Sequence, residues 1–290
     1  MDFRSFMKLK KTILVDGAIG TQMIERGIET GGVANLNNPK DVMEIHKDYF
    51  DAGSDVIFTN TFTSNRIYVQ THNLDIDVMA ANKAGVEIAK MACPKGKYVL
   101  ADMGSTGQLL TPYGTYTEEE FYQNFREQAQ IFLEGGIDGF VIETQTDVRE
   151  TRCVTRACRS ISDLPILVSY TFSKTPKGFV TMMGNYLTEC VQNAVDEGAD
   201  VVGANCGELA PAELAEVVSA IKSISNIPVI VQPNAGKPKL VDGITKYDMS
   251  PEVFAEGIKK CIEAGAHLVG GCCGTTPEHI GKVRCYMDDR

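Results

Sequence analysis

Hydrophobic and polar residues follow two repeating patterns along the chain, and the first predicts strands. Eight short apolar runs are rich in β-branched residues and nearly continuous, which is typical of strands buried on both faces. Several echo one another, from "AGSDVIFT" at residue 52 to "AGAHLVGG" at residue 264. The predicted strands lie within residues 12–17, 52–59, 97–104, 135–142, 164–172, 197–204, 227–236 and 264–271.

The second pattern is helical and occupies the segments between the strands. Apolar residues recur there at three- and four-residue spacing. Start signals support several helices: Thr117 with Glu120 resembles a capping box, and a proline follows Asn38 and Ser250. The predicted helices span 39–52, 76–92, 118–135, 147–161, 186–198, 211–224, 251–264 and 276–285, and the longest loops span 27–38, 104–117 and 173–185.

Strand and helix alternate throughout, which predicts a parallel sheet covered by helices. Eight such units can close a (β/α)8 TIM barrel, whose strands are covered by side chains inside and by helices outside. An open doubly wound sheet is the alternative. It usually carries a GxGxxG phosphate loop after its first strand, whereas "VDGAIGTQM" has glycine only at 17 and 20. We therefore expect a single α/β domain, a (β/α)8 barrel spanning residues 1–290.

Composition narrows the functional classes. A net charge of −10 without a basic run argues against nucleic acid as a partner, because phosphate binding needs clustered Lys and Arg. The apolar runs fall short of the roughly 18 to 20 residues that cross a bilayer, so we expect no membrane partner. The basic start is followed only by Ile13-Leu14-Val15 before Asp16, which is too short for a signal peptide. We expect a soluble, cytoplasmic protein.

Polar residues at the strand ends are the candidates for chemistry, because barrel enzymes carry their sites where strands end and βα loops begin. The nine cysteines, in a chain without a secretory signal, favour thiol or metal chemistry over a disulfide framework. The strand-end candidates are Asp16, Thr59, Asn60, Asp102, Glu143, Tyr170, Cys206, Asn234, Cys272 and Cys273. The other cysteines are expected to be buried as small apolar residues: Cys93, Cys153, Cys158, Cys190, Cys261 and Cys285.

Three of these candidates can form one metal site. Cys206 ends the sixth predicted strand, and Cys272 with Cys273 ends the eighth, in "GGCCGTTPEHI". Side chains from alternate strands share a layer inside the barrel, and the flanking glycines permit a bend that turns both adjacent sulfurs inward. His267 begins its strand, about 16 Å from Cys272 by strand rise, and is too distant to be a ligand. The alternatives are metal-free buried cysteines and a disulfide between neighbours, which demands unusual backbone geometry.

Three thiolates leave one corner of a tetrahedron open, which is typical of catalytic zinc. Zinc binds thiolates readily and has no redox chemistry of its own. A free thiol with a pKa of about 8.5 is only a few per cent ionised at neutral pH, whereas a zinc-bound thiol loses its proton. Such a site would position a sulfur nucleophile for attack on an activated methyl group.

Six motifs follow one another along nearly the whole chain: "VDGAIGTQM" at 15–23, "TNTF" at 59–62, "ETQTDVRE" at 143–150, "GANCG" at 203–207, "PNAG" at 233–236 and "GGCCGTTPEHI" at 270–280. Together and in this order, they resemble the homocysteine S-methyltransferases and the homocysteine-binding domain of cobalamin-dependent methionine synthase.

The resemblance implies a zinc methyltransferase that converts homocysteine to methionine, with Cys206, Cys272 and Cys273 as the Zn2+ ligands. Asp16, Glu143 and Asn234 match positions that hold the amino acid end of the substrate, and backbone N–H groups near Gly17 would serve its carboxylate. Helix capping is the alternative role for Asp16 and Glu143.

The methyl donor is expected to come from outside the chain, which ends soon after the barrel closes. The resemblance favours a corrinoid protein docking over the mouth. Betaine or S-methylmethionine are the alternatives, although the chain has no Trp for a cation cage. A different thiol acceptor, or a non-catalytic barrel with structural zinc, also stays open. The sequence leaves the oligomeric state and the role of loop 104–117 open.

Overall fold

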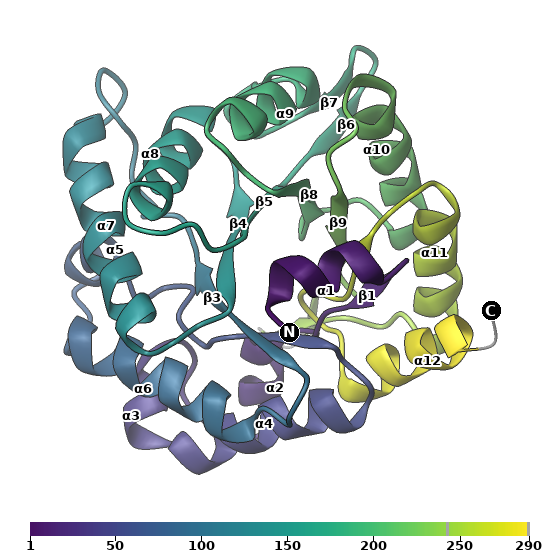
Figure 1. Cartoon of the computed structure of the whole chain (residues 1–290), viewed down its shortest axis with the longest axis horizontal. Coiled ribbons are helices and arrows are strands. Elements are labelled where there is room, and N and C mark those ends of the chain that lie inside the picture. Colours follow the sequence, from purple (N-terminus) through teal and green to yellow (C-terminus); the bar gives the residue numbers. More distant parts are fainter. Residues whose placement is uncertain (242–243, 289–290) are drawn as a thin grey trace.

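The computed structural model describes residues 1–241 and 244–288 and forms a closed parallel barrel (Figure 1). Its eight strands hydrogen-bond in the order β1-β12-β9-β8-β5-β4-β3-β2, all parallel, and a parallel bridge between Val15 and Val56 joins the two ends of the sheet. The predicted (β/α)8 fold is confirmed. The barrel strands are β1 (Ile13–Leu14), β2 (Val56–Phe58), β3 (Tyr98–Met103), β4 (Gly139–Gln145), β5 (Ile166–Tyr170), β8 (Val201–Asn205), β9 (Val229–Gln232) and β12 (Leu268–Val269).

Helices form the outer ring, and each predicted helix is present. The predicted capping box at Thr117 is also found: its hydroxyl accepts from the Glu120 amide, and the Glu120 side chain accepts from the Thr117 amide. The long helices are α4 (Pro39–Asp51), α6 (Val78–Ala92), α7 (Glu118–Glu134), α8 (Val148–Arg159), α9 (Leu187–Asp196), α10 (Pro211–Ile224), α11 (Pro251–Glu263) and α12 (Pro277–Asp288).

A short helix that the sequence patterns did not reveal closes the bottom of the barrel. Helix α1 (Phe3–Leu9) lies across the barrel axis in Figure 1. Phe3 and Met7 belong to the same buried cluster as the inward-facing strand residues, and the Phe3 ring lies 5.3 Å from the Tyr98 ring. Because this end is sealed by apolar side chains, the strand ends at the opposite face are where a ligand can enter.

Two of the predicted loops contain regular structure. The segment 173–185 includes a hairpin of β6 (Ser173–Thr175) and β7 (Gly178–Val180), and 27–38 includes helix α3 (Val33–Asn37). These elements are three to five residues long, too short to generate a periodic pattern. Loop 104–117 is irregular apart from an isolated bridge. The remaining short elements are α2 (Ile19–Glu25), α5 (Arg66–Thr71), β10 (Lys239–Val241) and β11 (Ile244–Lys246).

Within residues 1–241 and 244–288, no helix combines the length and apolar character that a bilayer crossing requires.

One buried histidine makes the fold sensitive to acid. His46 on α4 has no exposed surface, and both of its ring nitrogens lack a hydrogen-bond partner among the described residues. Burial lowers the pKa of His46 from 6.5 to about 4. The folded state therefore holds the neutral ring at pH values where the unfolded chain already binds a proton.

We expect the free energy of unfolding to fall as the pH drops from 6.5 towards 4, because His46 binds a proton in the unfolded chain but stays neutral in the folded protein. The His46 contribution lost across this window is about 3 kcal/mol, at roughly 1.4 kcal/mol per pKa unit. His46→Leu should remove that part of the pH dependence. Urea unfolding of wild type and of His46→Leu at pH 7 and pH 5 measures the loss. The same decrease in unfolding free energy for both proteins would contradict the prediction.

Candidate metal centre

Three cysteine sulfurs meet at the open end of the barrel. Cys206 directly follows β8, and Cys272 and Cys273 follow β12. The Sγ atom of Cys273 lies 4.0 Å from the Sγ atoms of both Cys206 and Cys272, and all three sulfurs lie within 4.8 Å of one another. The structure thus brings together the three residues that the sequence suggested as metal ligands.

The end of strand β9, which lies between β8 and β12, fixes this geometry. The carbonyl oxygen of Gln232 accepts from the Cys206 amide at 3.0 Å, and that of Pro233 accepts from the Cys272 amide at 2.8 Å. Ala235 donates its amide to the Cys273 carbonyl at 3.0 Å. One short segment therefore holds both cysteine loops at a set distance.

Positive backbone φ angles aim the sulfurs inward. Cys206 has a φ of 58°, in the left-handed region that non-glycine residues seldom adopt, and Gly274 has a φ of 79°. A β-carbon at position 274 would lie 2.2 Å from the Tyr247 ring. Only glycine fits there, so the chain can turn sharply after the adjacent cysteines.

Asn205 supports the cluster from below, and sequence analysis did not single it out. Its Oδ1 accepts from the Thr144 amide at 2.8 Å and from the Ser169 hydroxyl at 2.7 Å. Its Nδ2 donates to Thr144 Oγ1 at 2.8 Å and reaches the Cys272 sulfur at 3.9 Å. The available signal was its place beside Cys206 in "GANCG".

The three thiols ionise unequally. Hydrogen bonds from Cys272 and Cys273 lower the pKa of Cys206 far below its usual value. The hydrogen bond with Cys206 raises the pKa of Cys273 to about 11, and hydrogen bonds with Cys206 and Cys273 raise the pKa of Cys272 well above its usual range. A single thiolate is therefore favoured in the cluster alone, and the second and third require a nearby positive charge.

The remaining cysteines lie away from this cluster. The prediction of buried small side chains is confirmed for Cys153, Cys158, Cys190 and Cys261. It is wrong for Cys285, which is exposed, and for Cys93, which is half-buried. Both lie at helix ends near the surface, where helical periodicity does not decide which face is covered.

A cavity of about 430 Å³ opens beside the three sulfurs. The strand ends supply its polar wall, and the segments around α2 and α5 supply its remaining sides. The cysteines, Asp16, Gly17 and Glu143 all line it, as do Asp102, Thr59 and Asn60 from the strand-end candidates. Tyr170 does not line it; that residue is buried in the layer between barrel and helices, where its ring lies 5.9 Å from the Phe172 ring.

Asp16 and Glu143 do not cap helices, so the alternative role considered for them is wrong. Asp16 Oδ2 accepts from the Phe58 amide at 2.8 Å, and Glu143 Oε2 accepts from Gln232 Nε2 at 3.3 Å. Burial raises the pKa of Asp16 well above its usual range. Burial also raises the pKa of Glu143 to about 7, and negative charge on Cys206 adds to the rise.

Gly17 lines the cavity, whereas Asn234 does not. A β-carbon on Gly17 would lie 2.6 Å from Thr275 Oγ1 and 2.9 Å from the Tyr49 hydroxyl, so the close approach of these segments requires glycine. Asn234 does not line the cavity; its Nδ2 donates to the Gly207 carbonyl at 2.8 Å, behind the Cys206 loop. Its Nδ2 hydrogen bond supports the cysteine loop, and the substrate contact that the resemblance implied for Asn234 stays a prediction.

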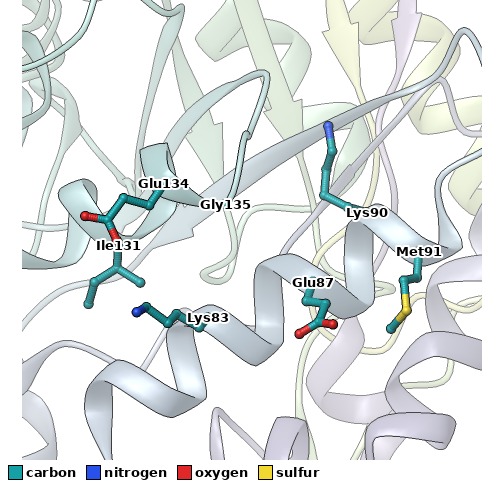
Figure 2. A pocket seen from close by; sticks show the side chains of 7 residues that line it. All are labelled: Lys83, Glu87, Lys90, Met91, Ile131, Glu134 and Gly135. Atoms are coloured by element: carbon teal, nitrogen blue, oxygen red, sulfur yellow. The ribbon is translucent and has the colours of Figure 1, made fainter.

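Another hollow lies on the outer wall between α6 and α7, away from the strand ends (Figure 2). Lys83, Glu87 and Lys90 project from one helix, and Ile131 and Glu134 from the other. Exposed charged side chains on a helical surface are an ordinary solvated face. The chemistry of the molecule is concentrated at the barrel mouth.

Fold and site together define a parallel β/α barrel with three thiols and several buried carboxyl groups at its mouth. The family model described as homocysteine S-methyltransferase matches residues 13–287. The chain therefore belongs to the homocysteine S-methyltransferase family.

Relatives and solved structures agree with this assignment. Methionine synthase from Mycobacterium leprae is 32% identical over 94% of this chain, and that from Mycobacterium tuberculosis is 31% identical over the same share. The chain spans only 24% of the length of each. The metallated crystal form of the homocysteine methyltransferase MmuM from Escherichia coli superposes with a TM-score of 0.80 at 21% identity, covering 98% of this chain and 99% of that one. This last likeness supports the fold.

We expect Asn205→Ala to destabilise the protein by about 2 to 4 kcal/mol, because the Thr144 amide and the Ser169 hydroxyl would lose their buried acceptor. Chemical denaturation measures the loss. Asn226→Ala, at an exposed asparagine between α10 and β9, is the matched control and should stay within about 0.5 kcal/mol of wild type. Equal effects of the two substitutions would show that the Asn205 hydrogen bonds contribute little.

Proposed function

We propose that the protein transfers a methyl group to the thiol of homocysteine, forming methionine, with Zn2+ held by Cys206, Cys272 and Cys273. The observation that carries this proposal is the group of three sulfurs within 4.8 Å of one another, facing a cavity lined by carboxyl groups. Family membership and the relatives named methionine synthase support the same reaction.

The sulfur geometry fits zinc. Zn–S bonds of about 2.3 Å at tetrahedral angles place two sulfurs roughly 3.8 Å apart, and two of the pairs here lie at 4.0 Å. A divalent cation would stabilise all three thiolates at once. The metallated crystal form of the neighbour MmuM adds support.

An open coordination position distinguishes a catalytic from a structural site. Among the residues with described positions, no fourth histidine, cysteine or carboxylate joins the group of three within 4.8 Å. A purely structural zinc would need such a ligand. When bound, the metal would hold the acceptor thiol as a thiolate, the form that attacks a methyl group.

The chain's own residues would orient the acceptor. Asp16 and Glu143 lie on the cavity wall, where they would accept hydrogen bonds from the substrate ammonium. Gly17 lines the same cavity, where backbone N–H groups near it would serve the substrate carboxylate. Asn205 and Asn234 would act indirectly by holding the cysteine loops.

For the donor we propose a methyl-corrinoid protein that docks over the barrel mouth. The support is the motif resemblance to cobalamin-dependent methionine synthase and the cavity that opens there. The absence of Trp from the chain removes the aromatic residue that binds quaternary ammonium groups most strongly. Betaine and S-methylmethionine are the small-molecule alternatives, and both are cations or carry a cationic centre.

We expect Cys206→Ala, Cys272→Ala and Cys273→Ala each to lose zinc and to reduce methionine formation by more than about 100-fold. Substituting a residue that only orients a metal ligand already lowers metal affinity or activity by roughly 10- to 100-fold. Zinc content and methionine production are measured together. The matched control is Cys285→Ala, because that cysteine is exposed and outside the cluster. Full zinc content in any of the three site variants would refute its assignment as a ligand.

The donor proposal is tested by mixing the zinc-loaded protein and homocysteine with one donor at a time. We expect methionine from a methylated corrinoid protein, and a slower reaction from free methylcobalamin, which lacks the docking surface. Betaine and S-methylmethionine should give none. Methionine from either small molecule alone would overturn the choice of donor while leaving the acceptor reaction intact.

A further inference from the structure

One side of the cavity is aromatic and differs from the strand ends. The strand ends supply cysteines and carboxyl groups, whereas the segment around α5 supplies the rings of Phe62, Tyr68 and His72. The Tyr68 and His72 rings are stacked, with centroids 3.9 Å apart. These three rings form the aromatic wall of the cavity. Because α1 seals the bottom of the barrel, a methyl donor would reach the sulfurs through the mouth, where this wall lies.

The start of loop 104–117 is in contact with the aromatic wall. A β-carbon on Gly104 would lie 2.5 Å from the Phe62 ring, and one on Gly107 would lie 3.3 Å from His72 Cε1. The Gly104 amide also donates to the Phe62 carbonyl at 3.2 Å. Glycine at both positions lets the loop backbone lie close against the rings. The position of the loop therefore sets how far the rings can move.

Glu150 on α8 fixes this part of the loop. Its Oε1 accepts from the Thr106 amide at 2.6 Å and from the Thr106 hydroxyl at 2.8 Å, and its Oε2 accepts from the Ser105 hydroxyl at 2.8 Å. Burial raises the pKa of Glu150, and these three hydrogen bonds oppose the rise. All three donors belong to two adjacent residues between Gly104 and Gly107, so one carboxyl group holds the loop at the contact with the wall.

Asn65 connects the same loop to the helix that carries Tyr68. Its Nδ2 donates to the Ser105 carbonyl at 3.2 Å. Its Oδ1 accepts from the Tyr68 amide at 2.9 Å and so caps the start of α5. The loop is thus bound to α8 on one side and to α5 on the other. A change at Glu150 would be passed to the aromatic wall through these contacts.

We propose that Glu150 is a positioning residue for methyl transfer, which holds residues 104–107 so that the aromatic wall seats the methyl donor above the sulfurs. This inference rests on the proposed methyl transfer and assigns the donor side of the same cavity. Glu150 is the last residue of "ETQTDVRE", whose first residue, Glu143, lines the cavity. One motif would therefore serve the acceptor at its start and the donor at its end.

A positioning role and a purely structural role for Glu150 predict different results when it is replaced. In the described part of the chain, its side-chain hydrogen bonds reach Ser105 and Thr106, which do not line the cavity. A positioning role therefore changes the kinetics of the donor and leaves zinc content and homocysteine affinity as they are. A purely structural role would lower stability and impair the use of both reactants alike.

The test compares wild type with zinc-loaded Glu150→Gln, using homocysteine as the acceptor and free methylcobalamin as the donor. Glutamine keeps the size of the side chain, but its NH2 group cannot accept the hydrogen bonds that the lost oxygen accepted. We expect kcat/KM for methylcobalamin to fall about tenfold, because a small displacement from the productive geometry slows transfer steeply. Homocysteine affinity, measured by calorimetry, and zinc content should stay at the wild-type values. Amide hydrogen exchange at residues 105–107 should become faster.

Thr106→Val removes one donor from the loop side and is the milder second variant. In the double variant with Glu150→Gln, the loss should be smaller than the product of the two single losses, because both changes break the same contact. Glu87→Gln is the matched control and should behave as wild type, since Glu87 is exposed on the outer face of α6. If betaine or S-methylmethionine proves to be the donor, the same comparison uses that molecule.

Two results would overturn the inference alone: an unchanged kcat/KM for the donor in both Glu150→Gln and Thr106→Val, or a loss of homocysteine affinity equal to the loss in donor kcat/KM. The proposed function fails in a different way. Wild-type protein that binds zinc but forms no methionine from any of the donors would refute the methyl transfer, and the inference with it.

Discussion

The end of strand β9 is the contact on which the candidate site depends. Cys206 and Cys273 are 67 residues apart in sequence, yet the strands that carry them flank the same neighbour. Closure of the ring fixes the spacing of β8, β9 and β12, and the Gln232 and Pro233 carbonyls then bind the amides of the two cysteine loops. The sulfur positions thus depend on the closed barrel, which places the end of β9 between the two strands that carry the cysteine loops.

The two ends of the barrel differ in the polarity of their buried side chains. At the bottom, α1 and the inward-facing aliphatic side chains form a continuous apolar cluster that needs no partner. At the mouth, carboxyl groups, thiols and unpaired amide oxygens are buried together, at a cost in stability. Such a division is expected when binding groups are held ready in a rigid frame before the ligand arrives.

Sequence patterns predicted the parts of this structure that repeat. Strand and helix periodicity located every barrel strand and every long helix, and the strand-end rule then pointed to the cysteines. Short or non-periodic features were missed: α1 has only seven residues, and the support from Asn205 depends on partners 36 and 61 residues away. Asn234 was expected to hold the substrate; β9 ends at Gln232, which lines the cavity, whereas Asn234 lies two residues further on and is not part of the cavity wall.

Charge explains why the mouth combines thiols with carboxyl groups. Three thiolates and three carboxylates would bring six negative charges into one cavity, and the raised pKa values of Asp16, Asp102 and Cys272 show that the protein alone does not hold them all ionised. A divalent ion would neutralise the sulfur side, and an ammonium group would neutralise the carboxyl side. The two cations differ in size and in preferred ligands, so neither can replace the other. In the proposed reaction, a ligand that carries both a thiol and an ammonium would supply both interactions at once.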